Sequence, residues 1–211
     1  MGIGIGIALA IAMGPCFQIF RQERVKSRRV CRKSPRSPSG CIEEGGGWKL
    51  ESWETELPEF IPPATMKLMQ RWCGDRLIQA CSDPNEFYAI LDDLPEPVAG
   101  VLCADLLVGD VMNGGFDQYF QNSFGITINR AILTMRALGL IDHANAARKA
   151  KMVFGEEFPD DHSSRMDKMD VLPESQFDEA TDEFYAAEDS HPEGIFNVLQ
   201  SAAKQLLVGL H

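Results

Sequence analysis

Hydrophobic residues recur at three- and four-residue intervals from about residue 65 to residue 208. That period is typical of amphipathic helices, and no run of β-branched alternation competes with it. We therefore predict an all-α fold, a single compact multi-helix domain of about seven helices. The expected helices are 65–81, one beginning at Pro84, 97–112, 127–138, 142–154, 175–189 and 193–208.

Capping signals indicate where these helices begin and end. Thr65 can cap the first helix, and Ser82 or Asp83 the second. The run Asn113-Gly114-Gly115 should end the central helix, because glycine readily takes the left-handed conformation of a helix C-terminus. Residues 156–173 are polar and show no period, so we expect an irregular segment there.

Composition divides the chain into two parts. Residues 1–62 form an apolar, then basic, then Pro/Gly/Ser-rich extension and linker, expected to be disordered or weakly ordered, and residues 63–211 form the acidic helical domain. Residues 1–20 are apolar but precede their basic flank, the reverse of a secretory signal peptide. A membrane anchor, an atypical signal peptide and a wrongly placed start codon stay open. The first and third leave the body in the cytoplasm, so we expect a cytoplasmic protein with no membrane contact except through residues 1–20.

Charge is distributed unevenly along the chain. In total, 20 Lys and Arg stand against 31 Asp and Glu, a formal net charge of −11. Residues 1–40 carry a net +7, so residues 41–211 carry −18. A body this acidic repels the phosphates of DNA and RNA, which argues against direct nucleic-acid binding by the folded domain.

The acids concentrate between residues 152 and 193, which hold 14 acids and two bases. On a helical wheel, Phe177, Ala180, Phe184 and Ala187 form one arc, and most carboxylates form the opposite arc. Six acids from Asp178 to Asp189 give roughly one charge per 3 Å of helix axis, compared with about 3.4 Å along one strand of duplex DNA. This face could therefore imitate a phosphate strand, although a solvated helix face shows the same pattern.

Residues 111–125, VMNGGFDQYFQNSFG, interleave aromatic and amide side chains. Phe116, Tyr119 and Phe120 share one helix face, which predicts a buried aromatic cluster. Amides placed among them can satisfy backbone groups at helix ends and turns. The predicted structural motif consists of Asn113, Gly114, Gly115, Phe116, Gln118, Tyr119, Phe120, Asn122 and Ser123.

This segment resembles the hallmark of the DNA-mimic protein C-terminal domain family, an α-helical group. The similarity extends from about Met66 to Leu206 and includes RAILTMRALGL, the Phe158-Pro159 turn leading to Arg165, and the acidic FDEATDEFYAAED helix. In that family an acidic surface imitates duplex DNA, and a homodimer occupies the DNA-binding surface of a transcription regulator. The resemblance implies that the mimicking carboxylates are Asp178, Glu179, Asp182, Glu183 and Asp189, joined by Glu156, Glu157, Asp160 and Asp161.

No motif supports catalysis. The four histidines are scattered, and the chain has no nucleophile elbow, phosphate loop or His-Glu-x-x-His pattern. The six cysteines form no Cys-x-x-Cys pair and are expected to be reduced, so we expect no metal and no cofactor. Asp105 and Asp110, in the most apolar helix, should be partly buried and paired with one of Arg130, Arg136 or Arg148.

The sequence therefore predicts a non-enzymatic acidic protein that binds a protein partner, such as a basic DNA-binding regulator. One alternative is an interaction module of the same fold whose partner does not bind DNA. Another is a metal-dependent enzyme built around Asp160, Asp161 and His162.

Overall fold

The computed structural model describes residues 62–173 and 175–209. Over these ranges the fold is all-α, as predicted, with nine α-helices, one 3-10 helix and no strand. Residues 1–61 lie outside the described residues, and the predicted division at residues 62 and 63 stays a prediction. The elements are α2 (Ala64–Trp72), α3 (Arg76–Ala80), α4 (Pro84–Asp92), α5 (Glu96–Gln121), the 3-10 helix η1 (Ser123–Thr127), α6 (Ile128–Ala137), α7 (Ile141–Met152), α8 (His162–Met169), α9 (Asp178–Ser190) and α10 (Ile195–Gly209).

Helix α5 is the centre of the fold. It contacts α2, α4, α6, α8, α9, α10 and η1, and between Val98 and Phe120 it contributes more buried apolar side chains than any other helix. By length and composition it is also the one helix in the described ranges that could cross a membrane. However, 67% of its apolar window is buried inside the protein, as the central position of a core helix requires.

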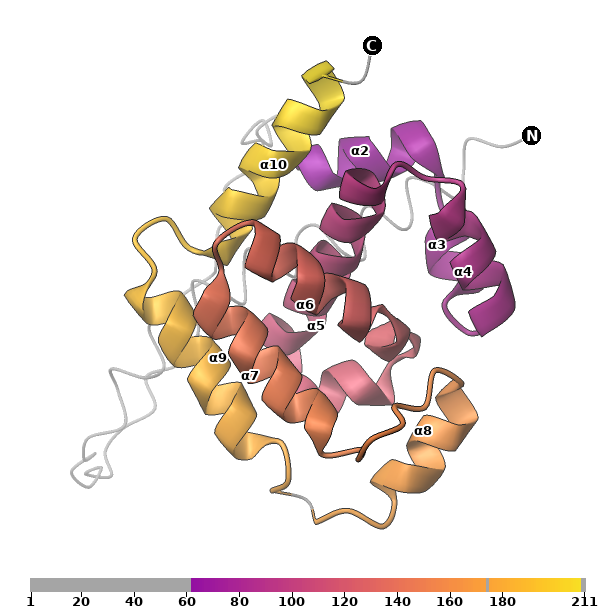
Figure 1. Ribbon diagram of the computed structural model, residues 1–211, viewed down its shortest axis with the longest axis vertical. Coiled ribbons are helices and arrows are strands. Elements are labelled where there is room, and N and C mark those ends of the chain that lie inside the picture. Colours follow the sequence, from indigo (N-terminus) through magenta and orange to yellow (C-terminus); the bar gives the residue numbers. More distant parts are fainter. Residues whose placement is uncertain (1–61, 174, 210–211) are drawn as a thin grey trace, which may run out of the picture.

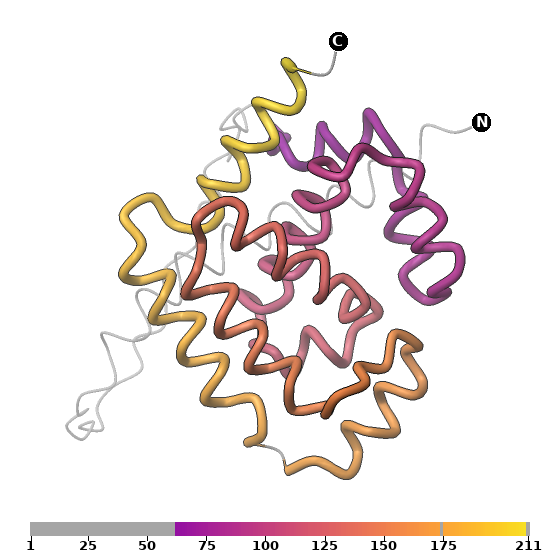
Figure 2. The backbone as a smooth tube through the Cα atoms, viewed as in Figure 1, coloured from indigo at the N-terminus to yellow at the C-terminus, as the bar shows by residue number. Residues whose placement is uncertain are grey.

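Helices α6, α7 and α9 form a layer over α5. α6 packs on α5 and on α7, and α7 packs against α9. Figures 1 and 2 show α7 and α9 side by side, with α9 at the outer edge of the body. The acidic helix therefore has one flank against the protein and the other in solvent.

Several predicted signals are confirmed. Asp83 caps α4, since its Oδ1 accepts hydrogen bonds from the N–H groups of Asn85 and Glu86, and Pro84 is the first helical residue. α6 and α7 end close to Gly139 and Gly155, which have φ angles of 79° and 87°. Within the described ranges, the cysteines are buried and free, namely Cys73, Cys81 and Cys103.

The first predicted helix, 65–81, is wrong in its length and its cap. The chain breaks into α2 and α3 around Gly74, whose φ of 57° is a left-handed conformation. Pro63 is the N-cap residue of α2, and Thr65 lies buried inside the helix. The Thr65 hydroxyl accepts a hydrogen bond from the side-chain amide of Gln200 in α10, so a tertiary contact replaces the predicted cap.

The run Asn113-Gly114-Gly115 redirects α5 and does not end it. Gly114 and Gly115 have non-helical backbone angles, with a φ of 80° at Gly115, and helical geometry resumes as far as Gln121. The aromatic segment is thus a continuation of the central helix, rotated by the kink.

The segment 156–173, predicted to be irregular, contains α8. Asp161 caps this helix by accepting hydrogen bonds from the Ser164 N–H and the Ser163 hydroxyl. The buried residue of this helix is Arg165. Because arginine is charged, its burial produces no hydrophobic period in the sequence, and the helix was missed.

Candidate partner-binding surface

The kink in α5 is completed by side chains of α9. In a regular helix the Val111 carbonyl would accept from the N–H of Gly115, and the Phe116 N–H would donate to the residue four positions earlier. At the kink, the Tyr185 hydroxyl donates to the Val111 carbonyl at 2.8 Å, and the Phe116 N–H donates to Thr181 Oγ1 at 3.1 Å. Both partners come from one side of α9, because Thr181 and Tyr185 are four residues apart.

Aromatic packing also holds α9 against α5. The Phe116 ring meets the Phe184 ring edge to face at a centroid distance of 5.5 Å, and the Phe120 ring lies 5.2 Å from that of Phe177. The predicted apolar arc of α9 is confirmed as its buried side, with no member more than 6% exposed: Phe177, Ala180, Phe184 and Ala187. The carboxylate arc must then face away from the core.

The amides of the motif satisfy a carboxylate inside α5. Asn122 Nδ2 donates to Asp110 Oδ2 at 3.1 Å, and Gln118 is also hydrogen-bonded to Asp110. Burial raises the pKa of Asp110 to about 6, against the opposing effect of these two hydrogen bonds. Burial likewise raises the pKa of Asp105 to about 6, with Thr65 as its hydrogen-bonding partner.

The predicted ion pairs of these two carboxylates with an arginine are wrong. No ion pair of Asp105 or Asp110 occurs in the part of the chain that the structure describes, and Arg130 instead lies 3.4 Å from a carboxylate oxygen of Glu96. Arg136 donates to the side chain of Asn145. Neutral partners cost less desolvation than a second buried charge, which suits the apolar surroundings of α5.

Arg165 joins the end of α5 to the loop before α8. Its side chain is fully buried, and its guanidinium donates to the carbonyls of Phe120 and Asn122 at 3.0 Å and to those of Pro159 and Asp160 at 3.2 Å. The carbonyls at a helix C-terminus carry partial negative charge, so the cation replaces the lost helical partners there. The Asn-Gly-Gly-Phe segment and the Phe158-Pro159 turn, which both carry the family resemblance, are thus parts of one connected buried structure.

The remaining motif residues are divided between core and surface. Tyr119 is buried and hydrogen-bonds the Thr127 hydroxyl at 2.8 Å, whereas Ser123 contacts the Ser82 hydroxyl at 3.2 Å near the surface. Asn113 is exposed beside the kink. The motif is therefore concentrated on shaping the end of α5, and little of it faces solvent.

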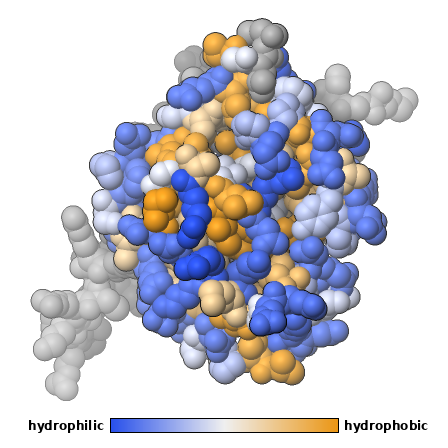
Figure 3. Space-filling model, in the orientation of Figure 1, coloured by the Kyte–Doolittle hydropathy of each residue, from blue (hydrophilic) through white to orange (hydrophobic). Residues whose placement is uncertain are grey.

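The carboxylates of α9 form the exposed surface that we call the acidic face, consisting of Asp178, Glu179, Asp182, Glu183 and Asp189, all exposed. At about 100° per residue, Asp178, Asp182 and Asp189 fall within an arc of about 40° that adjoins the Thr181 side of the helix. Glu179 and Glu183 form a second row, on the side of α7. Figure 3 shows a largely hydrophilic surface over α9, with apolar side chains gathered over α6 and α7.

Lys149 of α7 bridges the second row. Its Nζ lies 2.6 Å from Glu179 Oε1 and 2.8 Å from Glu183 Oε1, and these hydrogen bonds, first that with Glu179, raise the pKa of Lys149. The two glutamates therefore already share a cation, whereas the described residues supply no ion pair to the three aspartates. Sequence alone gave no sign of this bridge, because the residues are 30 or more positions apart.

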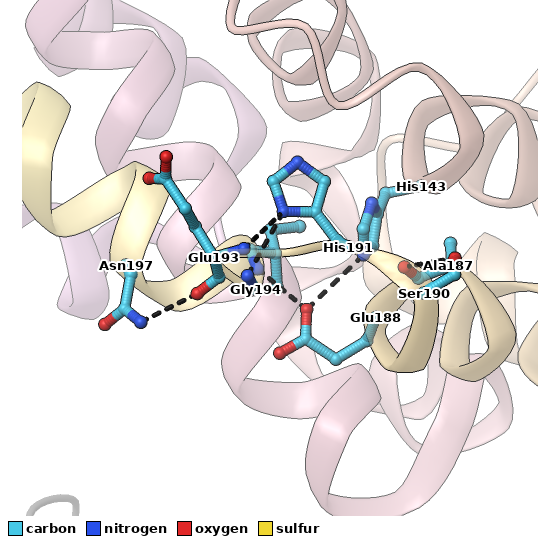
Figure 4. Close-up of polar contacts among 9 residues, drawn as sticks. His143, Ala187, Glu188, Ser190, His191, Glu193, Gly194 and Asn197 are labelled. Carbon is cyan, nitrogen blue, oxygen red and sulfur yellow. Dashed lines mark hydrogen bonds and ion pairs between the residues drawn. The ribbon is translucent and has the colours of Figure 1, made fainter.

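The sixth acid of the helix, Glu188, turns inward. Its Oε2 accepts from the Ile195 N–H at 2.7 Å and lies 3.5 Å from Nε2 of the buried His143. His191 Nδ1 accepts from the N–H groups of Glu193 and Gly194, which holds the turn between α9 and α10 (Figure 4). This cluster fixes the C-terminal end of α9 and adds no charge to the acidic face.

The four acids predicted outside α9 separate into two pairs. Glu156 and Glu157 are exposed and follow Phe154, whose ring lies 5.8 Å from that of Phe177, so they sit close to the N-terminal end of α9. Asp160 hydrogen-bonds Tyr88 of α4. Asp161 caps α8, and the hydrogen bonds of that cap, first from the Ser164 N–H, lower its pKa to about 2.

The metal-site alternative gains no support from this geometry. Nowhere in residues 62–173 or 175–209 do three His, Cys, Asp or Glu side chains come together as metal ligands. The Asp161 carboxylate is occupied by the cap of α8, and His162 Nε2 lies 2.8 Å from the Gln121 carbonyl. Asp161 and His162 are therefore engaged in structural contacts, whereas the buried Oδ1 of Asp160 has no hydrogen-bond partner among the described residues.

Comparison with known proteins identifies the family. The family model described as DMP19-like protein matches residues 92–202, more than half of the chain, from the end of α4 into α10. No curated protein and no solved structure matches the chain. The matched range holds both the kinked α5 and the acidic α9. The chain belongs to the DMP19-like protein family, a family of DNA mimics and not a class of enzymes.

Proposed function

We propose that this protein binds the DNA-binding surface of a basic transcription regulator through the acidic face of α9. The observation that carries the proposal is the row of Asp178, Asp182 and Asp189, exposed on a helix whose opposite side is packed into the core. These three carboxylates lie along about 16 Å of helix axis, roughly one per 8 Å, and together with Glu179 and Glu183 they give the outer side of α9 a negative field that attracts lysines and arginines. Membership of a DNA-mimic family supports this use of the surface.

Glu156 and Glu157 would extend the surface beyond the N-terminal end of α9. Asp160 and Asp161 would contribute only to the long-range field, because their carboxylates are held by Tyr88 and by the cap of α8. The partner's cations would compete with salt ions for the aspartate row, so the affinity should fall as ionic strength rises.

The proposal is tested by capturing proteins from a lysate of the source organism on the immobilised full chain. Captured proteins should be basic DNA binders, and both added duplex DNA and rising salt should release them. Their binding to the triple variant D178N/D182N/D189N should be at least about ten-fold weaker, because the interface loses three charges. Capture of proteins that do not bind DNA, or that stay bound in high salt, would favour the interaction module with another kind of partner.

A matched control separates a local face from net charge. The variant E86Q/D93N/D167N removes three exposed acids, one in α4, one at its C-cap and one in α8, away from α9 in Figure 1. Its total charge equals that of the α9 variant, so binding should stay close to that of the wild type. Equal loss in both variants would mean that overall charge, and not the acidic face, determines binding.

We also propose that the protein acts as a homodimer. Leu133 of α6 and Ile141 at the start of α7 are large apolar residues that are 66% and 48% exposed. Figure 3 shows apolar side chains gathered over α6 and α7, and a gathered apolar patch is a candidate for a subunit contact. Light scattering on the full chain should give the mass of two chains, and L133E should shift it to that of one. A wild-type mass of one chain would contradict the dimer and leave the α9 proposal in place.

A further inference from the structure

The buried motif and the acidic face meet at one place, the contact between the α5 kink and α9. The Thr181 hydroxyl accepts from the Phe116 N–H, directly after Gly115, and the Tyr185 hydroxyl donates to the Val111 carbonyl, four residues before it. Gly115 itself has a φ of 80°, and a Cβ there would lie 3.0 Å from Thr181 Cγ2 and 3.1 Å from its Oγ1. The backbone of α5 can therefore approach α9 this closely because residue 115 has no side chain.

This contact lies on the side of α9 next to the aspartate row. On a wheel of about 100° per residue, the aspartate row is centred about 80° from Thr181, and the apolar arc lies on the other side of Thr181. A rotation of α9 by one residue would carry the row toward the core. Aromatic packing and the Lys149 bridge hold α9 on its other sides, and the two hydrogen bonds add directional contacts with fixed backbone partners on the side next to the aspartate row.

We propose that the kink at Gly114-Gly115 sets the orientation of α9, with Thr181 and Tyr185 as positioning residues for the row of Asp178, Asp182 and Asp189. The inference rests on the proposed function. It means that the hallmark segment, residues 111–125, affects binding indirectly, through its contacts with α9. The segment touches no partner, yet it fixes the geometry with which the carboxylates meet one.

The test uses full-length T181V and Y185F, which remove one hydroxyl each and leave every charge in place. Two cationic probes distinguish charge from geometry: a flexible nona-arginine peptide, and a purified helix-turn-helix DNA-binding domain, whose cations are held rigidly. Both variants should bind nona-arginine within about two-fold of the wild type and the rigid domain about three- to ten-fold more weakly, which is the range of one lost hydrogen bond. T181S keeps the hydroxyl and should restore binding.

Hydrogen exchange provides a readout that does not depend on any partner. In T181V the amides of α9 should exchange faster, while those of α5 before Val111 keep the wild-type rate. Unchanged exchange in α9 together with an unchanged ratio of the two affinities would overturn the inference, and so would equal weakening toward both probes. If the wild type does not prefer the rigid domain to nona-arginine, the proposed function loses support, and the exchange of α9 alone then decides the inference.

Discussion

Helices α5 and α9 use their carboxylates in opposite ways. In α5, Asp105 and Asp110 are partly withdrawn from water, accept hydrogen bonds from neutral side chains, and have pKa values raised to about 6 by burial. In α9, Asp178 and Asp182 are exposed on a helix whose apolar side is buried. Burial of the first pair costs desolvation free energy, which their hydrogen bonds partly offset. The second pair stays in water, where a partner could reach it.

The hallmark segment and the acidic face are therefore under different constraints. The hallmark segment, residues 111–125, is held by packing and by hydrogen bonds of the buried Arg165 and the partly buried Asn122, so most substitutions there would disturb the fold. The exposed carboxylates contribute little to the fold and can vary without loss of it. Membership of the family therefore assures the scaffold more firmly than it assures any one partner.

The largest expected effect comes from removing Arg165, which holds the buried C-terminal end of α5. R165M should lower the free energy of unfolding by about 3–5 kcal/mol, because it leaves four backbone carbonyls without their cationic donor inside the protein. Urea denaturation followed by circular dichroism measures this loss. R148M, at an exposed position of α7, should change the free energy by less than about 0.5 kcal/mol, and a similar loss in both variants would contradict the role assigned to Arg165.

Arg165 also illustrates what the sequence could and could not predict. Helices with apolar stripes, such as α4 and α9, were predictable because their buried residues are hydrophobic and periodic. α8 was missed because its buried residue is an arginine, whose partners Phe120 and Asn122 lie more than 40 positions away. The break at Gly74 and the kink at Gly115 both depend on backbone angles that tertiary contacts select, so a glycine in the sequence left either outcome open.

The same limit applies to the acidic face. Its exposed arc was predictable from the helical period of Phe177, Ala180, Phe184 and Ala187. The kink contacts of Thr181 and Tyr185 and the bridge from Lys149 connect residues that are distant in sequence, so no local pattern announces them. A weak local sign existed for Thr181 and Tyr185, which flank the apolar arc four residues apart.

A second prediction concerns the cost of the carboxylates in α5. A carboxyl whose pKa is higher in the folded chain than in the unfolded chain stabilises fully below about pH 3.8, and that contribution is lost as the pH rises through about 6. D105N removes the charge and keeps an oxygen that can accept from Thr65. It should therefore stabilise the protein by about 1–2 kcal/mol at pH 7.5 and have almost no effect at pH 4.

Thermal unfolding of D105N and the wild type across this pH range provides the measurement. D167N, at an exposed position of α8, is the control and should show a nearly constant difference from the wild type. If the gain from D105N is the same at pH 4 and pH 7.5, the desolvated charge of Asp105 is not its cause.

A third prediction tests the close approach of α5 and α9 at the kink and compares two glycines of α5. G115A should destabilise the protein by about 1–2 kcal/mol, because the φ of 80° is strained for alanine and the new Cβ presses on Thr181. G109A should stabilise it by up to about 1 kcal/mol, since Gly109 is helical and has open space where a Cβ would lie. Urea titration measures both, and shifts of the same sign would contradict the close approach of α9 at the kink.

The smallest expected effect tests the exposed side, through the cation that the chain itself provides. Lys149 bridges Glu179 and Glu183, so K149M should free that row and strengthen the binding of nona-arginine by about two- to five-fold at low salt. R148M removes one positive charge from the neighbouring position without breaking a bridge and should have a smaller effect, since only the long-range field changes. Fluorescence titration measures both affinities, and the difference should vanish at high salt because screening removes the ion-pair contribution. Equal gains would mean that Lys149 acts on α9 by net charge alone. A larger gain for K149M would show that Lys149 competes with a partner's cations for Glu179 and Glu183, two of the five carboxylates of the acidic face.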